Sequence, residues 1–198
     1  MDALGVDYEV VPADIDEAAL LDQSGSPEDA ARMLALRKAE TVASLRPGAH
    51  VLAADTLVCL SGRVFGKPAD TQEARDMLKA LRGKPHRVVT GIALLPPPPA
   101  DPIVAHVNTS VLMRPYTDEE IDAYIATGAP MDKAGAYGVQ DTEFHPAAPI
   151  NGCYFNVVGL PLCAASEMLR QAGFPPIVDL DTAAACISHR CPFAGLGR

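Results

Sequence analysis

Basic residues are few in this sequence. Its 198 residues include 16 Lys and Arg against 25 Asp and Glu, which gives a formal net charge of -9. Because nucleic-acid phosphates repel an acidic surface and bind through clusters of Lys and Arg, this balance argues against a general nucleic-acid-binding protein. A small anionic substrate remains compatible with the composition, provided that a few local cations attract it.

Long apolar runs are also missing. No stretch approaches the roughly 20 apolar residues that a transmembrane helix needs, and the first residues lack the basic and apolar segments of a signal peptide. The sequence therefore predicts no membrane association and a cytoplasmic location.

Cysteine is scarce, and its number is odd. The five cysteines stand at irregular spacings, which predicts reduced thiols and no disulfide framework. Cys186, His189 and Cys191 match no strong zinc-binding pattern. With 48% hydrophobic and 21% charged residues, the chain can form one well-cored globular domain.

The most informative stretch runs from Val51 to Pro68 and reads VLAADTLVCLSGRVFGKP. Two apolar runs flank a turn at residues 61–63, which predicts a β-hairpin. Asp55 interrupts the first run, where a lone carboxylate is costly unless it is paired or binds a cation. The hairpin would bring Asp55 close to Lys67, so that one charge could hold a metal and a water while the other neutralises a phosphate. A hydrogen-bonded strand residue without a catalytic role is the simpler interpretation of Asp55 in isolation.

Capping patterns predict three helices. They begin after Ser26, Asp70 and Thr117, and the third ends at Gly128. Strands are expected at residues 8–11, 86–95, 103–113 and 153–160, with a turn at 150–152 and a last helix at 163–171.

A glycine-rich segment, PMDKAGAYGVQ, follows the third helix. Its glycines allow the backbone to approach a ligand closely. Lys133, Tyr137 and Gln140 offer it a cation, a stacking face and a base-reading amide. By itself, this pattern is also that of a generic glycine-rich loop.

Taken together, several blocks of the sequence resemble the Maf family of nucleoside triphosphate pyrophosphatases. They are AADT at 53–56, GKP at 66–68, TGIA at 90–93, the run that ends at Gly128, DKAGAYGVQ at 132–140 and NVVGLPL at 156–162. The resemblance implies a domain at 1–173 and a C-terminal extension at 174–198. It also implies an α/β fold similar to inosine triphosphate pyrophosphatases, with a long mixed sheet flanked by helices, a cleft between two lobes, and a homodimer as one option.

The activity that the resemblance implies is hydrolysis of a nucleoside triphosphate to the monophosphate and pyrophosphate with a divalent cation, Mg²⁺ or Mn²⁺. Asp55 corresponds to the proton acceptor, acting as a base or as a metal ligand, and Glu17 would share the metal. The substrate-binding residues would be Lys38 and Lys67 at the phosphates, Thr56 and Gln140 at the base, and Lys133. The combination of AADT with GAYGVQ resembles the branch that prefers dTTP and UTP to methylated guanine nucleotides.

Two departures from the family pattern bear on activity. A Ser-x-x-Arg-Arg loop that grips the triphosphate would precede Met1, and Asp141 replaces the usual Gly, which adds a negative charge near an anionic substrate. The alternative function is therefore a catalytically impaired nucleotide-binding or interaction protein that has lost the phosphate-gripping loop.

Overall fold

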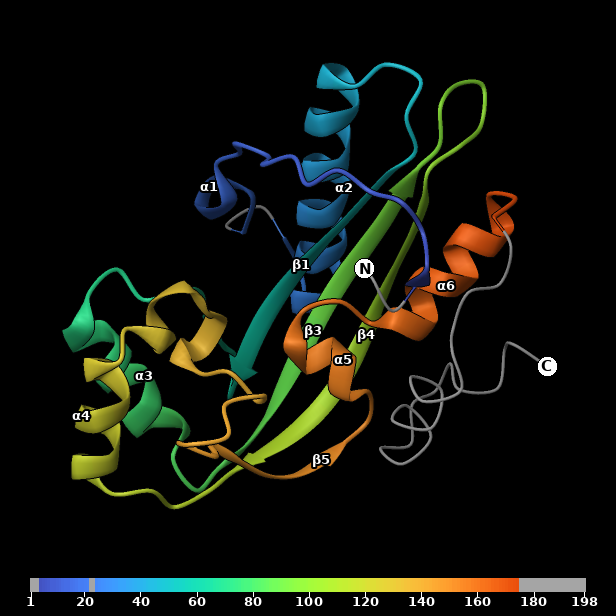
Figure 1. Cartoon of the computed structure of the whole chain (residues 1–198). Coiled ribbons are helices and arrows are strands. Elements are labelled where there is room, and N and C mark those ends of the chain that lie inside the picture. Colours follow the sequence, from blue (N-terminus) through green and yellow to red (C-terminus); the bar gives the residue numbers. More distant parts are fainter. Residues whose placement is uncertain (1–3, 22–23, 175–198) are drawn as a thin grey trace.

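The computed structural model of the chain describes residues 4–21 and 24–174 (Figure 1). Its strands are β1 (Val51–Leu60), β2 (Arg63–Phe65), β3 (Pro85–Leu95), β4 (Ile103–Met113) and β5 (Ala147–Asn151). Its helices are α1 (Glu17–Leu21), α2 (Pro27–Leu45), α3 (Thr71–Leu81), α4 (Asp118–Ala126), α5 (Tyr154–Val158) and α6 (Leu162–Gln171), with two 3-10 turns, η2 (Ala129–Asp132) and η3 (Ala134–Ala136). None of the described helices is long and apolar enough to cross a membrane.

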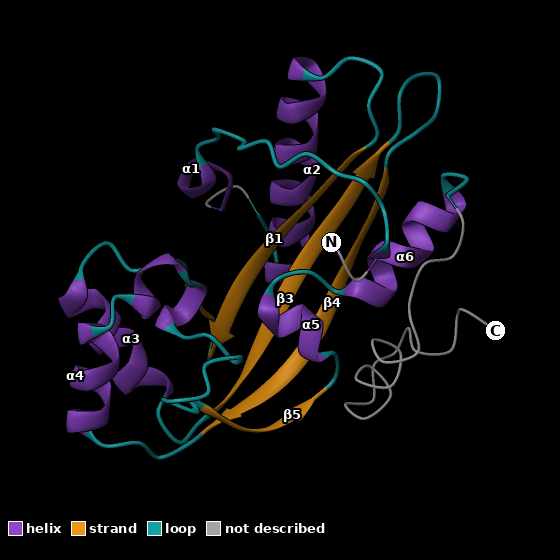
Figure 2. Ribbon diagram, in the orientation of Figure 1, coloured by secondary structure: helices purple, strands orange, loops and turns teal. Residues whose placement is uncertain are grey.

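The strands form one sheet in the order β2-β1-β3-β4-β5. The predicted hairpin is confirmed: β1 and β2 pair around a two-residue turn at Ser61 and Gly62, both with positive φ, as a tight hairpin turn requires. The α/β class and the flanking helices are confirmed as well (Figure 2). The mixed strand direction is not seen in the part described, where every strand pair is antiparallel.

Helices cover both faces of the sheet. Helix α2 packs on β1 and β3, while α5 and α6 pack on β3 and β4 from the other side. The contact with α2 is very close at Gly91 in β3, because a Cβ built there would lie 1.9 Å from the carbonyl oxygen of Ala31. Only glycine lets the backbone of α2 come so close to the strand.

A second group of elements lies at one end of the sheet. Helices α3 and α4 and the turns η2 and η3 share a buried cluster with that end, in which Tyr116 and Tyr124 contact Phe144. The predicted caps are present: Ser26, Asp70 and Thr117 each accept a backbone N–H of the first turn that follows. The candidate site lies between this group of α3, α4, η2 and η3, called the α4 group below, and the side of the sheet that α2 covers.

Three predicted elements were wrong. Residues 8–11 form no regular strand, and residues 150–151 belong to β5 instead of a turn. The strand predicted at 153–160 is largely the short helix α5, although Tyr, Phe and Val favour strands. Tertiary hydrogen bonds override that preference, because the side chain of Asn156 reaches the carbonyl of Val88. The predicted extension beyond residue 174, with Cys186, His189 and Cys191, lies outside the described residues.

Candidate active site

The candidate site lies along one edge of β1. Strand β3 pairs with β1 from Val51 to Cys59, whereas on the other edge β2 pairs with it only from Val58 to Leu60. A cavity of about 280 Å³ opens beside the remaining stretch. Consecutive side chains of a strand point to opposite faces, so Asp55 and Thr56 enter this cavity from opposite sides of the sheet.

Three charged groups converge at one side of the cavity. Helix α2 directs Lys38 toward β1, and its Nζ donates to Asp55 Oδ1 at 2.5 Å. The same Nζ lies 2.7 Å from Oε1 of Glu17, in the first turn of α1. Asp55 is 8% exposed, while Glu17 remains about half exposed. The carboxylate that interrupts an apolar strand is therefore paired, as its desolvation requires.

Burial and pairing act on the pKa values of this pair in a defined way. Burial raises the pKa of Asp55 above its ordinary value, against the opposing pull of the Lys38 ammonium. Burial also disfavours the charged Lys38, but its hydrogen bonds to Asp55 and Glu17 prevail and raise the lysine pKa. The proton thus stays on Lys38, and the Asp55 carboxylate is a stronger base than an exposed aspartate.

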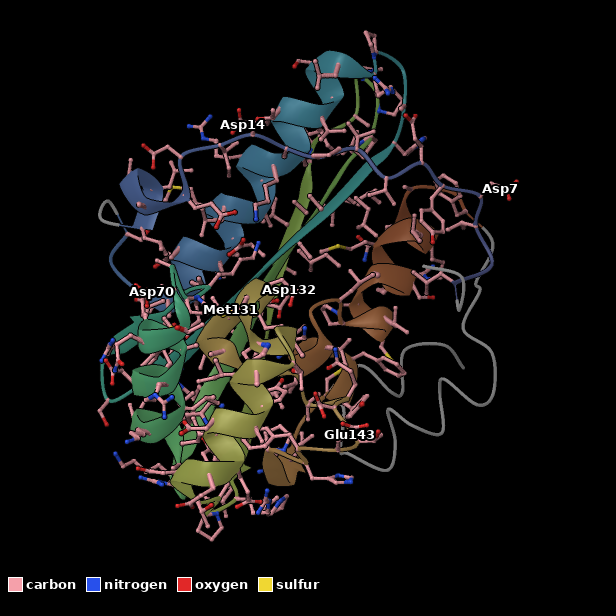
Figure 3. All side chains as sticks on the ribbon, turned by 60° about the vertical axis from the view of Figure 1, so that its left-hand side comes forward. Asp7, Asp14, Asp70, Met131, Asp132 and Glu143 are labelled. Carbon is pink, nitrogen blue, oxygen red and sulfur yellow. The ribbon has the colours of Figure 1, made fainter. Side chains whose placement is uncertain are left out.

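Lys67 lines the same cavity, as the predicted hairpin requires. It follows Gly66, whose carbonyl accepts the N–H of Gly135 at 2.9 Å. This bond ties the GKP segment to the glycine-rich loop of residues 132–140. Figure 3 labels Asp132 at the start of that loop, at the end of the α4 group that is nearer to α2.

The opposite part of the cavity carries fewer charges. Thr56, Gly138, Gln140 and Gly159 line it together with the apolar residues 157 and 158. Lys133 also lines the cavity, and its Nζ donates to the carbonyl of Ala129 and to Asp132 Oδ1, both at 2.6 Å. The structure thus brings together all the residues that the sequence analysis assigned to substrate or metal, namely Glu17, Lys38, Asp55, Thr56, Lys67, Lys133 and Gln140.

Two details of the glycine-rich loop differ from expectation. Tyr137, predicted as a stacking face, lines the cavity, but it is only 5% exposed and its hydroxyl shares a 2.7 Å hydrogen bond with His86 Nε2. Asp141, expected to repel the substrate, turns its Oδ1 to the backbone N–H groups of Glu143 and Phe144. Its carboxylate therefore closes a local turn, and it does not line the cavity that holds Asp55.

Three residues that hydrogen-bond to the lining of the site had no function predicted from the sequence. The Tyr124 hydroxyl accepts the N–H of Gly138 at 3.1 Å, and Thr90 and Asn156 hydrogen-bond beneath Thr56. Thr90 and Asn156 stand in the TGIA and NVVGLPL blocks, which is the only signal that pointed to them. Their roles depend on contacts between residues far apart in the chain.

Buried His86 gives a prediction about acid stability. Burial lowers its pKa from 6.5 to about 4. Below pH 6.5 this histidine binds a proton in the unfolded chain but stays neutral in the folded protein. The contribution of neutral His86 to the unfolding free energy is therefore complete above pH 6.5 and is lost as the pH falls toward 4. The loss amounts to about 3 kcal/mol of unfolding free energy. Urea unfolding at pH 7 and near pH 4 should show a smaller acid loss in His86→Gln than in the parent chain.

The control for this experiment is His50→Gln, because His50 is exposed. It should keep the full acid loss of the parent protein. Equal acid losses in the two variants would mean that protonation of His86 does not limit the folded state.

The donors present fit a divalent cation that takes most of its ligands from substrate and water. Mg²⁺ is commonly held by one or two carboxylates plus substrate phosphates. Asp55 in β1 and Glu17 in α1 both contact the ammonium group of Lys38, so the two carboxylates lie close enough together to share a cation. Among the described residues, no cluster of three or more His, Cys, Asp or Glu side chains could hold a metal without a substrate.

Comparison with known proteins places this geometry in context. The family described as Maf-like protein matches residues 1–172. The chain is 46% identical to the dTTP/UTP pyrophosphatase of Thermomicrobium roseum over 191 residues, which cover 96% of this chain and 86% of that protein. It is 46% identical to the dTTP/UTP pyrophosphatase of Symbiobacterium thermophilum, with 87% of each chain covered. It is 44% identical to the protein of that name from Geobacter sp., with 87% of this chain and 89% of the relative covered.

Proposed function

The chain belongs to the Maf family, and on that premise we propose that it is a nucleoside triphosphate pyrophosphatase acting on dTTP and UTP. The relatives at 44–46% identity carry the name dTTP/UTP pyrophosphatase. The observation that carries the proposal is the convergence of Asp55, Lys38, Glu17 and Lys67 in one cavity. The charged residues supply a proton acceptor and phosphate-binding cations. Thr56 and Gln140 supply polar contacts for the nucleobase.

In this proposal, Asp55 takes the proton of a water that attacks the α-phosphate. Its burial favours this role, because desolvation makes the carboxylate a better proton acceptor. Lys38 holds Asp55 in place and can bind a phosphate oxygen when the nucleotide enters. Lys67, which lines the same cavity, neutralises charge on the leaving pyrophosphate.

A divalent cation, Mg²⁺ or Mn²⁺, is part of the proposal, with Asp55 and Glu17 as its protein ligands. When bound, it would neutralise negative charge that develops on the phosphate oxygens. Glu17 suits this role because it is half exposed and can leave Lys38 at little cost.

The proposal also covers the cellular location, the partners and the oligomeric state of the enzyme. The composition supports a cytoplasmic protein that binds no nucleic acid, and the family resemblance leaves a homodimer as an option. A catalytically impaired binding protein is not favoured, because the cavity keeps Glu17, Lys38, Asp55 and Lys67 and the relatives are named as enzymes.

The function is tested with a panel of triphosphates assayed for pyrophosphate release, with Mg²⁺, with Mn²⁺ and with EDTA. We expect dTTP and UTP to be cleaved fastest and EDTA to abolish the activity. The reason is that a hydroxyl and an amide can pair with the imide edge of a pyrimidine, whereas a purine needs a larger pocket. A preference for guanine nucleotides, or release of inorganic phosphate alone, would contradict the proposal.

A further inference from the structure

A buried hydrogen-bond network lies under the part of the cavity that Thr56 lines, where the nucleobase is proposed to bind. Asn156, fully buried in α5, donates its Nδ2 to the carbonyl of Val88 at 3.1 Å and to Thr109 Oγ1 at 3.0 Å. Thr109 in turn donates to the carbonyl of Cys153 and accepts its N–H. These bonds fix α5 against β3 and β4.

The backbone carbonyl of Asn156 faces β3. It accepts the N–H of Gly159 at 3.2 Å and the hydroxyl of Thr90 at 3.0 Å. Both of its lone pairs are therefore used. Thr90 is completely buried, so the carbonyl is a fixed acceptor in a site that excludes water.

This geometry determines where the hydroxyl protons lie. Thr90 Oγ1 is also 2.9 Å from Thr56 Oγ1, a distance at which either oxygen could donate. A hydroxyl has one proton, and a carbonyl has none. Because Thr90 gives its proton to Asn156, the Thr56 hydroxyl must donate to Thr90. The order is Thr56 to Thr90 to Asn156, in which each bond polarises the next.

We propose that Thr90 and the Asn156 carbonyl act as positioning residues that make Thr56 a pure hydrogen-bond acceptor toward the cavity, so that the site selects bases with an N–H at that point. This inference rests on the proposed function for the identity of the substrate. Gly159 lies next to this acceptor, because a Cβ built there would be in van der Waals contact with Thr56 Oγ1, at 3.7 Å.

The consequence is discrimination between uracil and cytosine. Uracil and thymine carry an N–H at ring position 3, whereas cytosine carries a lone pair there. In the same pose, cytosine would place its lone pair against those of Thr56 and leave both acceptors without a proton. Such a mismatch costs about ten- to a hundredfold in binding.

Thr90→Val tests the inference, because valine has nearly the shape of threonine but can neither accept nor donate. The Thr56 hydroxyl could then turn its proton toward the cavity and serve cytosine as well. Thr90→Ser, which keeps the hydroxyl, is the matched control. Binding of UMP and CMP is measured by titration calorimetry, alongside kcat/KM for UTP and CTP.

We expect the parent protein and Thr90→Ser to bind UMP at least about tenfold tighter than CMP, and Thr90→Val to lower that ratio to about threefold or less. Binding of inorganic pyrophosphate, which engages only the charged side, should change less than about twofold. If thermal unfolding shows that the valine variant is not folded, Thr90→Ala provides the same readout.

An unchanged UMP to CMP ratio in the valine variant would overturn the inference, as would a serine variant that behaves like valine or a parent protein that binds both nucleotides equally. Failure of the proposed function looks different. In that case no triphosphate is cleaved, yet the UMP preference and its dependence on Thr90 persist in the calorimetric measurement.

Discussion

Replacing Asp55 with Asn should lower kcat for dTTP hydrolysis by about 10²- to 10⁴-fold, because it removes the proton acceptor from the cavity. The amide has nearly the shape of the carboxylate, so the fold should persist. Lys38 keeps Glu17 as a partner, which limits the cost of leaving its charge behind. Measured under saturating substrate, the loss should appear in kcat more than in KM.

Asp118→Asn is the matched control for Asp55. Asp118 also accepts hydrogen bonds from two cations, Lys79 and Arg82, but it lies on the surface of α4 away from the cavity. That variant should retain activity within about twofold, since exposed ion pairs contribute little. Turnover of Asp55→Asn close to that of the parent chain would remove Asp55 from the reaction.

Gly91→Ala should be strongly destabilising, by more than about 4 kcal/mol in the unfolding free energy. The added Cβ would lie 1.9 Å from the carbonyl oxygen of Ala31 and 2.6 Å from the backbone nitrogen of Arg32. Backbone atoms inside a helix cannot turn away as a side chain would, so α2 as a whole must move off the sheet. Chemical denaturation of the variant measures the effect.

The control for this second prediction is Gly25→Ala, because a Cβ at Gly25 meets no atom within 4 Å. Its unfolding free energy should stay within about 1 kcal/mol of the parent value. If Gly91→Ala were equally mild, the contact between α2 and β3 would have to be looser than described. A partly folded Gly91→Ala should also lose activity, because α2 carries Lys38.

The parts of this structure that the sequence predicts best are those determined by neighbours in the chain. Ser26, Asp70 and Thr117 cap the helices that follow them through bonds that span three residues. The hairpin that brings Asp55 near Lys67 depends on a two-residue turn and two apolar runs. Each of these patterns is complete within about 20 residues, so no tertiary information is needed to recognise it.

The parts that escaped prediction depend on partners far away in the chain. Residues 154–158 have the composition of a strand, yet they are helical because Asn156 bonds to Val88 and Thr109 on two other strands. Tyr137 lines the cavity as expected, but its hydroxyl points into the interior and bonds to His86, 51 residues earlier. No local pattern distinguishes a buried, hydrogen-bonded tyrosine from one that stacks on a base.

The alternation of side chains along β1 has a consequence for how this protein can change in length. Asp55 lies opposite Gly91 and faces α2, whereas the next residue, Thr56, lies opposite Thr90 and faces α5. Inserting or deleting one residue just before Asp55 would turn the carboxylate toward Thr90 and Asn156 and the hydroxyl toward Lys38. Catalytic and base-reading groups would be misplaced in a single event, so β1 should tolerate no change in length, while the exposed connection at residues 98–102 can accept one.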